Sequence, residues 1–258
     1  MIYETMMFEK KDGIAIITMN RPENLNSINT KMQAEMKDIW EQVEVDKSIR
    51  VVIFTGGEKC FCAGADIKEV FPPGQSRPSS RDQFKKFEDD PRISIAAISG
   101  FCLGGGLELA LCCDLRIATD TAKFGLVELR IGSVPGAGGM QRLPRIIGIT
   151  KAKELLFTAG RMDVGEALRL GLINKIVPEK SLLDEAVKLA NVMLEFPPHG
   201  LKIAKRCVNE GMQVDLNTAL KLDLAISVQE MSTPTAIENR AEGLKAFREK
   251  RKPHFKAD

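Results

Sequence analysis

The segment that decides the fold spans residues 99–111 and reads SGFCLGGGLELAL. An apolar strand leads into three consecutive glycines, which open a helix whose first turn carries Glu108. Glycine lets a ligand or another backbone approach closely, and the unpaired N–H groups at a helix N-terminus carry a partial positive charge. The segment therefore predicts an anion or oxyanion site, with a packing cluster of glycines at a strand-to-helix turn as the alternative.

Glu108 is flanked by leucine and alanine on a helix that we expect to be largely buried. An ionised carboxylate without partners in such surroundings would cost several kcal/mol, so its pKa should rise toward the working pH. A carboxyl group tuned in this way can carry protons. The alternative is that Glu108 only stabilises the start of the helix as an acidic residue in its first turn.

A second carboxylate, Glu128, stands among apolar side chains in residues 124–132, FGLVELRIG. The Pro- and Gly-rich stretch that follows, residues 133–139, can bring backbone N–H groups against a ligand or open a second helix. Two carboxylates in apolar surroundings suggest one proton donor and one base. The alternative for Glu128 is a structural ion pair with Arg130 or Arg142.

A third segment, residues 60–69 with the sequence CFCAGADIKE, follows a strand and is expected to open a helix. Asp66 is a natural cap for that helix, and the N–H of Ala65 could remain free to bind an oxygen. The pair Cys60 and Cys62 could be half of a metal site, but neither a second cysteine pair nor a nearby histidine completes it. We therefore expect no metal.

The rest of the chain predicts a mixed α/β fold. Residues 3–19 read as a β-hairpin, residues 29–46 as an amphipathic helix, and residues 51–55 as a buried strand. Further short strands are expected at 95–99, 115–118 and 123–124. This recurrence of two strands and a helix suggests a spiral core.

From about residue 150 helices dominate, with one more strand at 173–177. The expected helices are 151–158, 164–170, 181–194, 201–210, 216–230 and 233–248. We assign residues 1–195 to the core and residues 196–258 to a helical region that serves oligomerisation. Residues 71–80 contain proline, glycine and serine and form either a lid or a plain surface connection.

Composition narrows the class of protein. A chain of 258 residues with 44% hydrophobic content can bury one sizeable core, and a net charge of +2 gives no global reason to expect nucleic acid or a membrane as partner. Met1 to Phe8 does not resemble a secretory leader, so we expect a cytoplasmic protein, although a mitochondrial matrix enzyme without its presequence would look the same. Six cysteines, with Cys112 and Cys113 in an apolar stretch, favour a reducing compartment. His199 and His254 are both expected to be solvated.

Together these segments resemble the enoyl-CoA hydratase/isomerase (crotonase) family. The resemblance rests on four motifs in order: Ala-Gly-Ala-Asp-Ile-Lys from residue 63, Gly-Gly-Gly-Leu-Glu-Leu-Ala from 104, Phe-Gly-Leu-Val-Glu from 124 and Pro-Gly-Ala-Gly-Gly-Met-Gln-Arg-Leu from 135. It extends from Arg21-Pro22 to the tail at 247–255. It implies a crotonase-like α/β spiral of repeated ββα units with a helical C-terminal region.

The resemblance also implies roles for individual residues. The N–H groups of Ala65 and Gly105 would form an oxyanion hole for a thioester carbonyl. Glu108 would activate or position water, and Glu128 would exchange the proton at the α-carbon. The implied substrate contacts are Asn24, Leu25, Ala63, Asp66, Ile67, Pro135, Gly138, Phe247 and Lys250, the last two from a C-terminal helix that could belong to a neighbouring subunit.

The implied activity is that of a hydro-lyase, an enoyl-CoA hydratase that adds water across the C2–C3 double bond of an enoyl- or dienoyl-CoA in fatty acid or aromatic acid degradation. No cofactor is implied, because CoA is part of the substrate, and the expected assembly is a trimer or a hexamer made of two trimers. A double-bond isomerase or a hydrolase on the same scaffold is the alternative, and an RNA-binding protein that uses the basic tail is a remote one. Many relatives carry Lys-Pro where this chain has Arg92-Ile93, and residues 70–90 follow no readable pattern, so the acyl group stays open.

Overall fold

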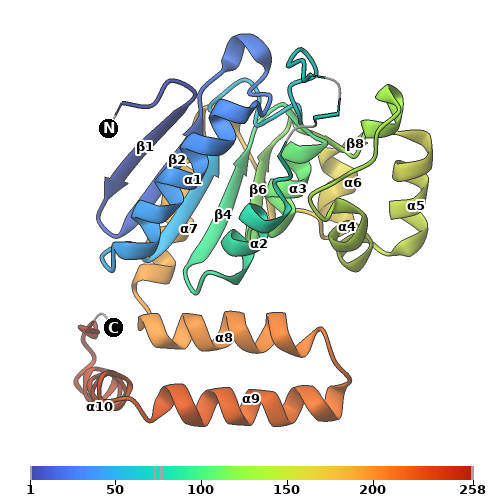
Figure 1. Cartoon of the computed structure of the whole chain (residues 1–258). Helices are drawn as coiled ribbons and strands as arrows, with labels where there is room; N and C mark the ends of the chain where they lie inside the picture. Colours follow the sequence, from blue (N-terminus) through green and yellow to red (C-terminus); the bar gives the residue numbers. More distant parts are fainter. Residues whose placement is uncertain (1, 73, 76–77, 257–258) are drawn as a thin grey trace.

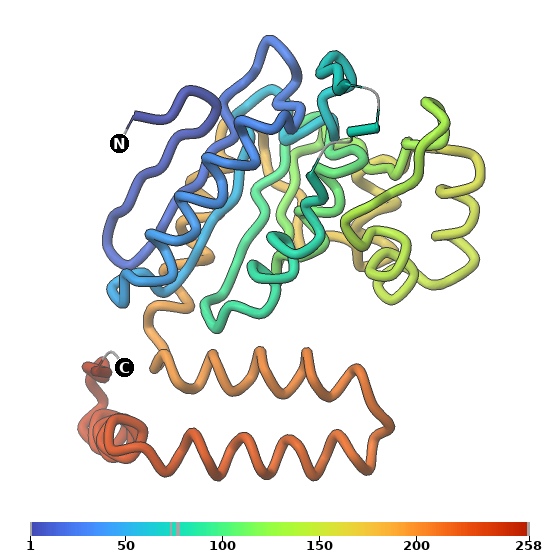
Figure 2. Tube along the Cα trace, viewed as in Figure 1, coloured from blue at the N-terminus to red at the C-terminus, as the bar shows by residue number. Residues whose placement is uncertain are grey.

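The computed structural model describes residues 2–72, 74–75 and 78–256. A mixed α/β body carries the N-terminal three quarters of the chain, and three C-terminal helices form a layer along one side of it (Figure 1). The tube in Figure 2 shows that the last helix ends beside the start of this layer, at the edge of the molecule nearest the N-terminal hairpin.

The larger sheet has six strands in the order β1-β2-β3-β4-β6-β9. Their bounds are β1 (Met6–Lys11), β2 (Ile14–Met19), β3 (Val51–Thr55), β4 (Ile93–Ile98), β6 (Leu115–Thr119) and β9 (Lys175–Val177). The predicted hairpin is confirmed: β1 and β2 are antiparallel, with Met6 opposite Met19. All the other pairs are parallel, so each needs a crossover connection, and helices provide most of them.

A smaller sheet contains β5 (Phe101–Leu103), β7 (Lys123–Gly125) and β8 (Met162–Asp163) in that order. The chain alternates between the two sheets, because β4 is followed by β5 and β6 by β7. A helical segment follows each such pair. After β3 the chain makes the same move to the smaller sheet, but only one residue takes part: Cys62 forms a parallel bridge to Cys102 of β5. The expected spiral of repeated ββα units is confirmed.

The two faces of the larger sheet are buried by different helices. Alternate residues of a strand point to opposite faces. Val51 and Ile53 of β3 join a cluster with Ala186 and Ala190 of α7 (Leu182–Leu194), whereas Phe54 belongs to the cluster on the other face. Figure 1 accordingly shows α1 (Thr30–Val45) and α7 on opposite sides of the sheet.

An aromatic cluster fills the α1 face. Trp40 of α1 contacts Phe87 with ring centroids 4.3 Å apart, and Phe54 lies 5.4 Å from the same ring. Phe87 belongs to α2 (Arg81–Asp89), a helix that the sequence analysis left unassigned. Its two inward-facing phenylalanines, Phe84 and Phe87, are buried, while most of the other side chains of α2 are polar.

The other expected helices are confirmed, with small changes of bounds: α3 (Gly105–Cys112), α5 (Ile149–Thr158), α6 (Val164–Arg169), α8 (Pro198–Gly211), α9 (Leu216–Met231) and α10 (Pro234–Glu249). Helix α4 (Gly139–Ile147) follows the Pro- and Gly-rich stretch, for which a helix start was one of two alternatives. Helix α8 begins three residues before its predicted start, because Pro198 occupies a first-turn position, where its missing N–H needs no partner.

The C-terminal layer is fastened to the core by a buried lysine. Lys205 of α8 donates from Nζ to the Arg92 carbonyl at 2.8 Å and to Asp114 Oδ2 at 2.9 Å. The assignment of residues 1–195 and 196–258 to separate units stays a prediction. The expectation for His199 is wrong: the ring is 4% exposed, because the start of α8 packs against α10, where Asn239 Nδ2 lies 3.5 Å from Nδ1.

Cys112 and Cys113 are buried, as expected, and all six cysteines are free thiols. Burial raises the pKa of Cys60 to about 11 and that of Cys62 to about 12. In the described part of the chain, no three histidine, cysteine or acidic side chains come together as a metal site. No helix within those same ranges is long and apolar enough to cross a membrane.

Candidate active site

Three short segments converge at one edge of the smaller sheet. Cys62 pairs in parallel with Cys102 of β5, and β5 pairs in parallel with β7. The carboxyl ends of parallel strands lie at the same edge, and ligands bind there in many α/β folds. Ala65, Gly105 and Glu128 each follow their strand within three residues, so the topology brings all three to this edge.

The N–H groups of Ala65 and Gly105 lie close together and are free. Ile28 donates to the Gly64 carbonyl at 2.8 Å and accepts from Asp66 N–H at 2.9 Å. In a parallel bridge of this kind the residue between, here Ala65, directs its own N–H to the opposite side. Gly105 is the first residue of α3, where an N–H has no partner within the helix. A Cβ placed on Gly105 would stand 3.9 Å from the nitrogen of Ala65, and neither N–H donates to an acceptor in the described chain.

Gly104 makes room for the second carboxyl group. Its φ is +51°, and its N–H donates to the Gly125 carbonyl at 2.8 Å, which joins the glycine turn to the end of β7. A Cβ at this position would stand 3.1 Å from Glu128 Oε1, tighter than most real contacts. The Glu128 carboxyl therefore lies directly against the turn that presents the Gly105 N–H.

Glu108 is held by two backbone N–H groups. Its side chain is 3% exposed, and Oε1 accepts from Ala137 N–H at 2.7 Å and from Gly139 N–H at 2.8 Å. These donors belong to the turn before α4, not to the start of α3, so the simple capping interpretation is wrong. Burial raises the pKa of Glu108, and the two N–H groups and the positive charge of Arg142 oppose that rise.

Glu128 has different surroundings. It begins the 3-10 turn Glu128–Ile131, and its Oε2 is buried without a hydrogen-bond partner in the described residues. Burial raises the pKa of Glu128 to about 7, and the negative charge of Glu108 adds to the rise. The alternative ion pairs are wrong, since Arg130 donates to the Ala159 carbonyl and Arg142 pairs with Glu88.

The turn that holds Glu108 comes from residues 135–139, which the sequence marked only as able to approach a ligand. Pro135 is buried, and Gly138 has a φ of +104°. A Cβ on Gly138 would stand 2.1 Å from Arg142 Nη1, so a side chain here would strain the backbone and displace this guanidinium. Sequence reasoning missed Ala137 and Gly139 as donors, because a backbone N–H leaves no mark on residue type.

Comparison with known proteins identifies the family of the chain. The family model described as enoyl-CoA hydratase/isomerase matches residues 9–258. The chain belongs to the enoyl-CoA hydratase/isomerase family. A crotonyl-CoA hydratase from Syntrophomonas wolfei is 40% identical over 99% of both chains, and a short-chain-enoyl-CoA hydratase from Clostridium acetobutylicum is 39% identical over 96% of this chain and 95% of the relative. The crystal structure of an enoyl-CoA hydratase from Bacillus anthracis has a TM-score of 0.88 and 37% identity, with 99% of this chain and 100% of that chain covered.

The enoyl-CoA hydratase/isomerase motif at residues 63–68 does not open a helix here, so that expectation is wrong. Asp66 is buried and bound by Arg21, whose Nη1 donates to Asp66 Oδ2 at 2.8 Å and to the Ser27 carbonyl at 2.7 Å. This ion pair ties the segment to the loop after β2, and Asp66 Oδ1 also accepts from the Lys68 N–H at 3.1 Å. Arg21 is a further positioning residue that the sequence reasoning did not identify.

Apart from Pro135 and Gly138, which belong to the turn beside Glu108, the substrate contacts implied by the family motifs fall into two groups. Ala63 N–H donates to the Leu25 carbonyl at 3.0 Å, and Lys68 Nζ lies 3.5 Å from Asn24 Oδ1, so the loop after β2 and residues 63–68 lie side by side. Ile67, in the same segment, is 71% exposed. The structure thus gathers Asn24, Leu25, Ala63, Asp66 and Ile67 near the free N–H groups, and their contacts with substrate stay predictions.

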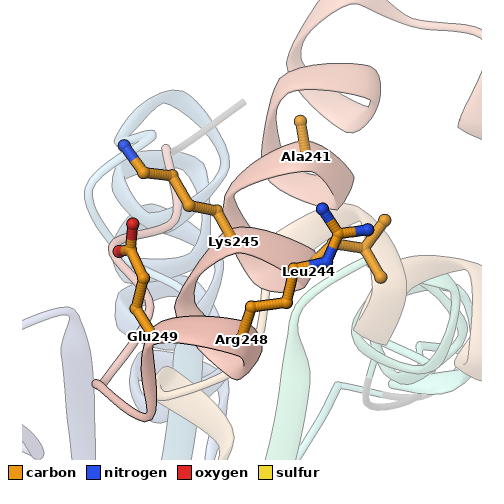
Figure 3. A pocket seen from close by; sticks show the side chains of 5 residues that line it. All are labelled: Ala241, Leu244, Lys245, Arg248 and Glu249. Atoms are coloured by element: carbon orange, nitrogen blue, oxygen red, sulfur yellow. The ribbon is translucent and has the colours of Figure 1, made fainter.

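Phe247 and Lys250 form the second group and lie at the end of α10. Phe247 is 84% exposed, and α10 belongs to the C-terminal layer, apart from α3, the helix that carries Glu108 (Figure 1). Figure 3 shows the hollow on α10, lined by Ala241, Leu244, Lys245, Arg248 and Glu249. None of the residues that hold the glutamate pair lines this hollow, and contacts of Phe247 and Lys250 with a substrate stay predictions.

The raised pKa of Glu128 predicts a pH-dependent gain of stability in Glu128→Gln. Folding favours the protonated carboxyl, so its favourable contribution is complete below the ordinary value of 4.5 and is lost as the pH rises to about 7. Glutamine mimics the protonated form at every pH. Because the side chain is half-buried, we expect the substitution to stabilise the protein by roughly 1–2 kcal/mol at pH 8 and by much less at pH 5.

Urea unfolding at both pH values and at one protein concentration measures this difference. The control is Glu41→Gln at an exposed position of α1, which should change the free energy of unfolding equally at the two pH values. An equal effect of Glu128→Gln at pH 5 and pH 8 would contradict the assignment of a raised pKa.

Proposed function

We propose that this chain is an enoyl-CoA hydratase that adds water across the C2–C3 double bond of an enoyl-CoA thioester. The names of its relatives, crotonyl-CoA hydratase and short-chain-enoyl-CoA hydratase, support this activity. The observation that carries the mechanism is the pairing of two buried carboxyl groups in different surroundings beside two free N–H groups. The enzyme is a hydro-lyase, and CoA enters as part of its substrate.

The free N–H groups of Ala65 and Gly105 bind the thioester oxygen. When water adds at C3, the electrons of the double bond move toward C2 and onto this oxygen, which becomes enolate-like. Fixed donors stabilise this developing charge more than they stabilise the neutral thioester, and one such donor contributes about 3 kcal/mol in comparable sites.

The two carboxyl groups divide the proton transfers. Glu108 is the acceptor: the N–H groups of Ala137 and Gly139 stabilise its ionised form and fix its orientation, and it takes a proton from water as the O–C3 bond forms. Glu128 is the donor: it holds a proton up to about pH 7 and gives it to C2 as the enolate collapses. One proton leaves water and one arrives at C2, so the pair ends with its proton on Glu108.

A double-bond isomerase is the nearest rival, since it can shuttle a single proton with one carboxylate. The backbone N–H groups of Ala137 and Gly139, which donate to Glu108, favour the hydratase. In a one-carboxylate isomerase Glu108 would have no proton to accept and would not need these two donors. The acyl group is not assigned, and short-chain enoyl-CoA is the first substrate to test.

Substitution of each glutamate separates the two roles. We expect Glu108→Gln and Glu128→Gln each to lower kcat for crotonyl-CoA hydration by about 10²- to 10⁴-fold, measured as loss of the enone absorbance. Exchange of the α-proton of a saturated acyl-CoA in D2O should persist in Glu108→Gln and disappear in Glu128→Gln. The exposed Glu154→Gln is the control and should behave as the wild type. Equal turnover by all four proteins would refute the carboxylate assignment.

The shared proton predicts a bell-shaped pH dependence of kcat/KM. The singly protonated pair is the active state for both hydration and dehydration, so both directions should show the same two limbs. The basic limb should begin near pH 7, where Glu128 loses its proton, and kcat/KM should then fall about tenfold per pH unit. The enzyme must stay folded over the whole pH range of the assay. A kcat/KM that is constant from pH 6 to pH 9 would exclude Glu128 as the proton donor.

The proposed assembly is a trimer or a dimer of trimers. It is supported by a stripe of exposed apolar side chains on α9, Leu216, Leu220, Leu224 and Val228, which recur every four residues on one side of the helix. Sedimentation equilibrium at micromolar concentration should give three or six copies of the chain, and a monomer would contradict the proposal.

A further inference from the structure

Arg142 of α4 is the side chain that joins the glutamate site to the body of the protein. Its Nε and Nη2 donate to the two oxygens of Glu88 at 2.8 and 2.9 Å, and its Nη1 donates to the Ala137 carbonyl at 2.8 Å. The side chain is 16% exposed. A bidentate pair of this geometry fixes the plane of the guanidinium, and Lys could not reproduce it.

The carbonyl that Arg142 binds lies between the two donors to Glu108. The N–H groups of Ala137 and Gly139 belong to the peptide units on either side of the Ala137–Gly138 peptide, whose oxygen accepts from Arg142 Nη1. The next carbonyl, that of Gly138, accepts from the backbone N–H of Arg142 at 3.0 Å. Arg142 therefore holds two successive carbonyls of the turn and leaves its N–H groups directed at Glu108.

The shape of the turn agrees with this role. A Cβ on Gly138 would displace Arg142 Nη1 from its present position, so glycine here lets the guanidinium lie directly against the turn. Glu88, which anchors the guanidinium, comes from α2, and α2 also packs Phe84 and Phe87 into the core. The hydrogen bonds thus run from α2 through Arg142 and the turn to Glu108.

We propose that Arg142 is a positioning residue for hydration, which fixes the Ala137–Gly139 turn and keeps Glu108 an ionised proton acceptor. This inference rests on the proposed function, since it concerns the base of that reaction. Arg142 touches neither substrate nor reacting atoms in this role and acts only through the turn and through its charge.

The charged groups around Glu108 decide the sign of the effect. Arg142 from α4 and Arg81 from α2 lower the pKa of Glu108, and Arg81 Nε also donates to the Gly136 carbonyl at 3.1 Å. Glu128 presents a carboxyl group from the turn after β7, and Glu88 from α2 neutralises part of the charge of Arg142. Cys112 on α3 has a raised pKa and stays a neutral thiol. Loss of Arg142 therefore removes a cation and loosens two donors, and both changes raise the pKa of Glu108.

The experiment measures the acid limb of kcat/KM for crotonyl-CoA hydration in four variants. Arg142→Met should lower kcat by about tenfold or more and move the acid limb to higher pH by at least about 0.5 pH unit. Arg142→Lys keeps the positive charge but loses the bidentate hydrogen bonds of the guanidinium. We therefore expect kcat to fall, while the acid limb of kcat/KM moves less than in Arg142→Met. Glu88→Gln frees the guanidinium without removing its charge, and the limb should stay or move to lower pH. The control Arg145→Met, on the same helix but exposed, should match the wild type.

The position of the limb does not depend on how much of each sample is folded, so a variant that folds poorly still gives a valid result. A purely structural role for Arg142 predicts lower yield and lower Tm with an unchanged limb, and that outcome would overturn the inference. If wild-type protein hydrates crotonyl-CoA and Arg142→Met keeps its kcat and its limb, the inference fails while the proposed function stands. If wild-type protein turns over no enoyl-CoA thioester, the proposed function itself fails.

Discussion

The hydrogen bonds from Ala137 and Gly139 to Glu108 make two otherwise similar carboxyl groups chemically different. Both groups are taken out of water, and burial alone would favour the protonated form of each. Glu108 Oε1 accepts two N–H groups from the turn before α4, whereas the burial of Glu128 is opposed only by its own backbone N–H, and its Oε2 has no partner among the described residues. The two carboxyl groups therefore have different surroundings, and the rest of the molecule is the scaffold that keeps this difference in place.

The scaffold achieves this with a very small sheet. Strands β5 and β7 have three residues each, and the third parallel position is only the bridge at Cys62. Such short strands add little stability by themselves, so the larger sheet and its helices must hold them in register. The benefit is geometric: the chain leaves each strand at the same edge, and within three residues it can present a backbone N–H or a carboxyl group to a common point.

The sequence predicted those features of the site that depend on residue type. Glu108 and Glu128 stand out because a carboxylate among leucines needs a reason, and the amphipathic helices follow from their periodicity. Contacts between distant segments could not be derived in the same way. Arg142 and Glu88 are separated by 54 residues, and the donors to Glu108 are backbone atoms, which any residue carries. His199 was misjudged for a related reason, since its burial comes from α10, a helix that begins 35 residues later.

Helix α2 and Asp66 illustrate two different limits of local patterns. In α2 the apolar signal is reduced to Phe84 and Phe87 within a highly charged segment, and the helix is stabilised by what these two rings contact, namely Trp40 and Phe54. At Asp66 the local pattern for a helix start is present, and Oδ1 accepts from the Lys68 N–H at 3.1 Å, while Oδ2 binds Arg21. The local capping interaction forms without a helix behind it, so a cap residue alone does not make a helix.

The asymmetry of the carboxyl pair also bears on how the enzyme resets. In the proposed mechanism hydration leaves the proton from water on Glu108, whose two N–H donors favour an ionised acceptor, and leaves Glu128 ionised without a partner for Oε2. Both features favour return of the proton to Glu128. The N–H groups that orient Glu108 as an acceptor thus also favour its release of the proton.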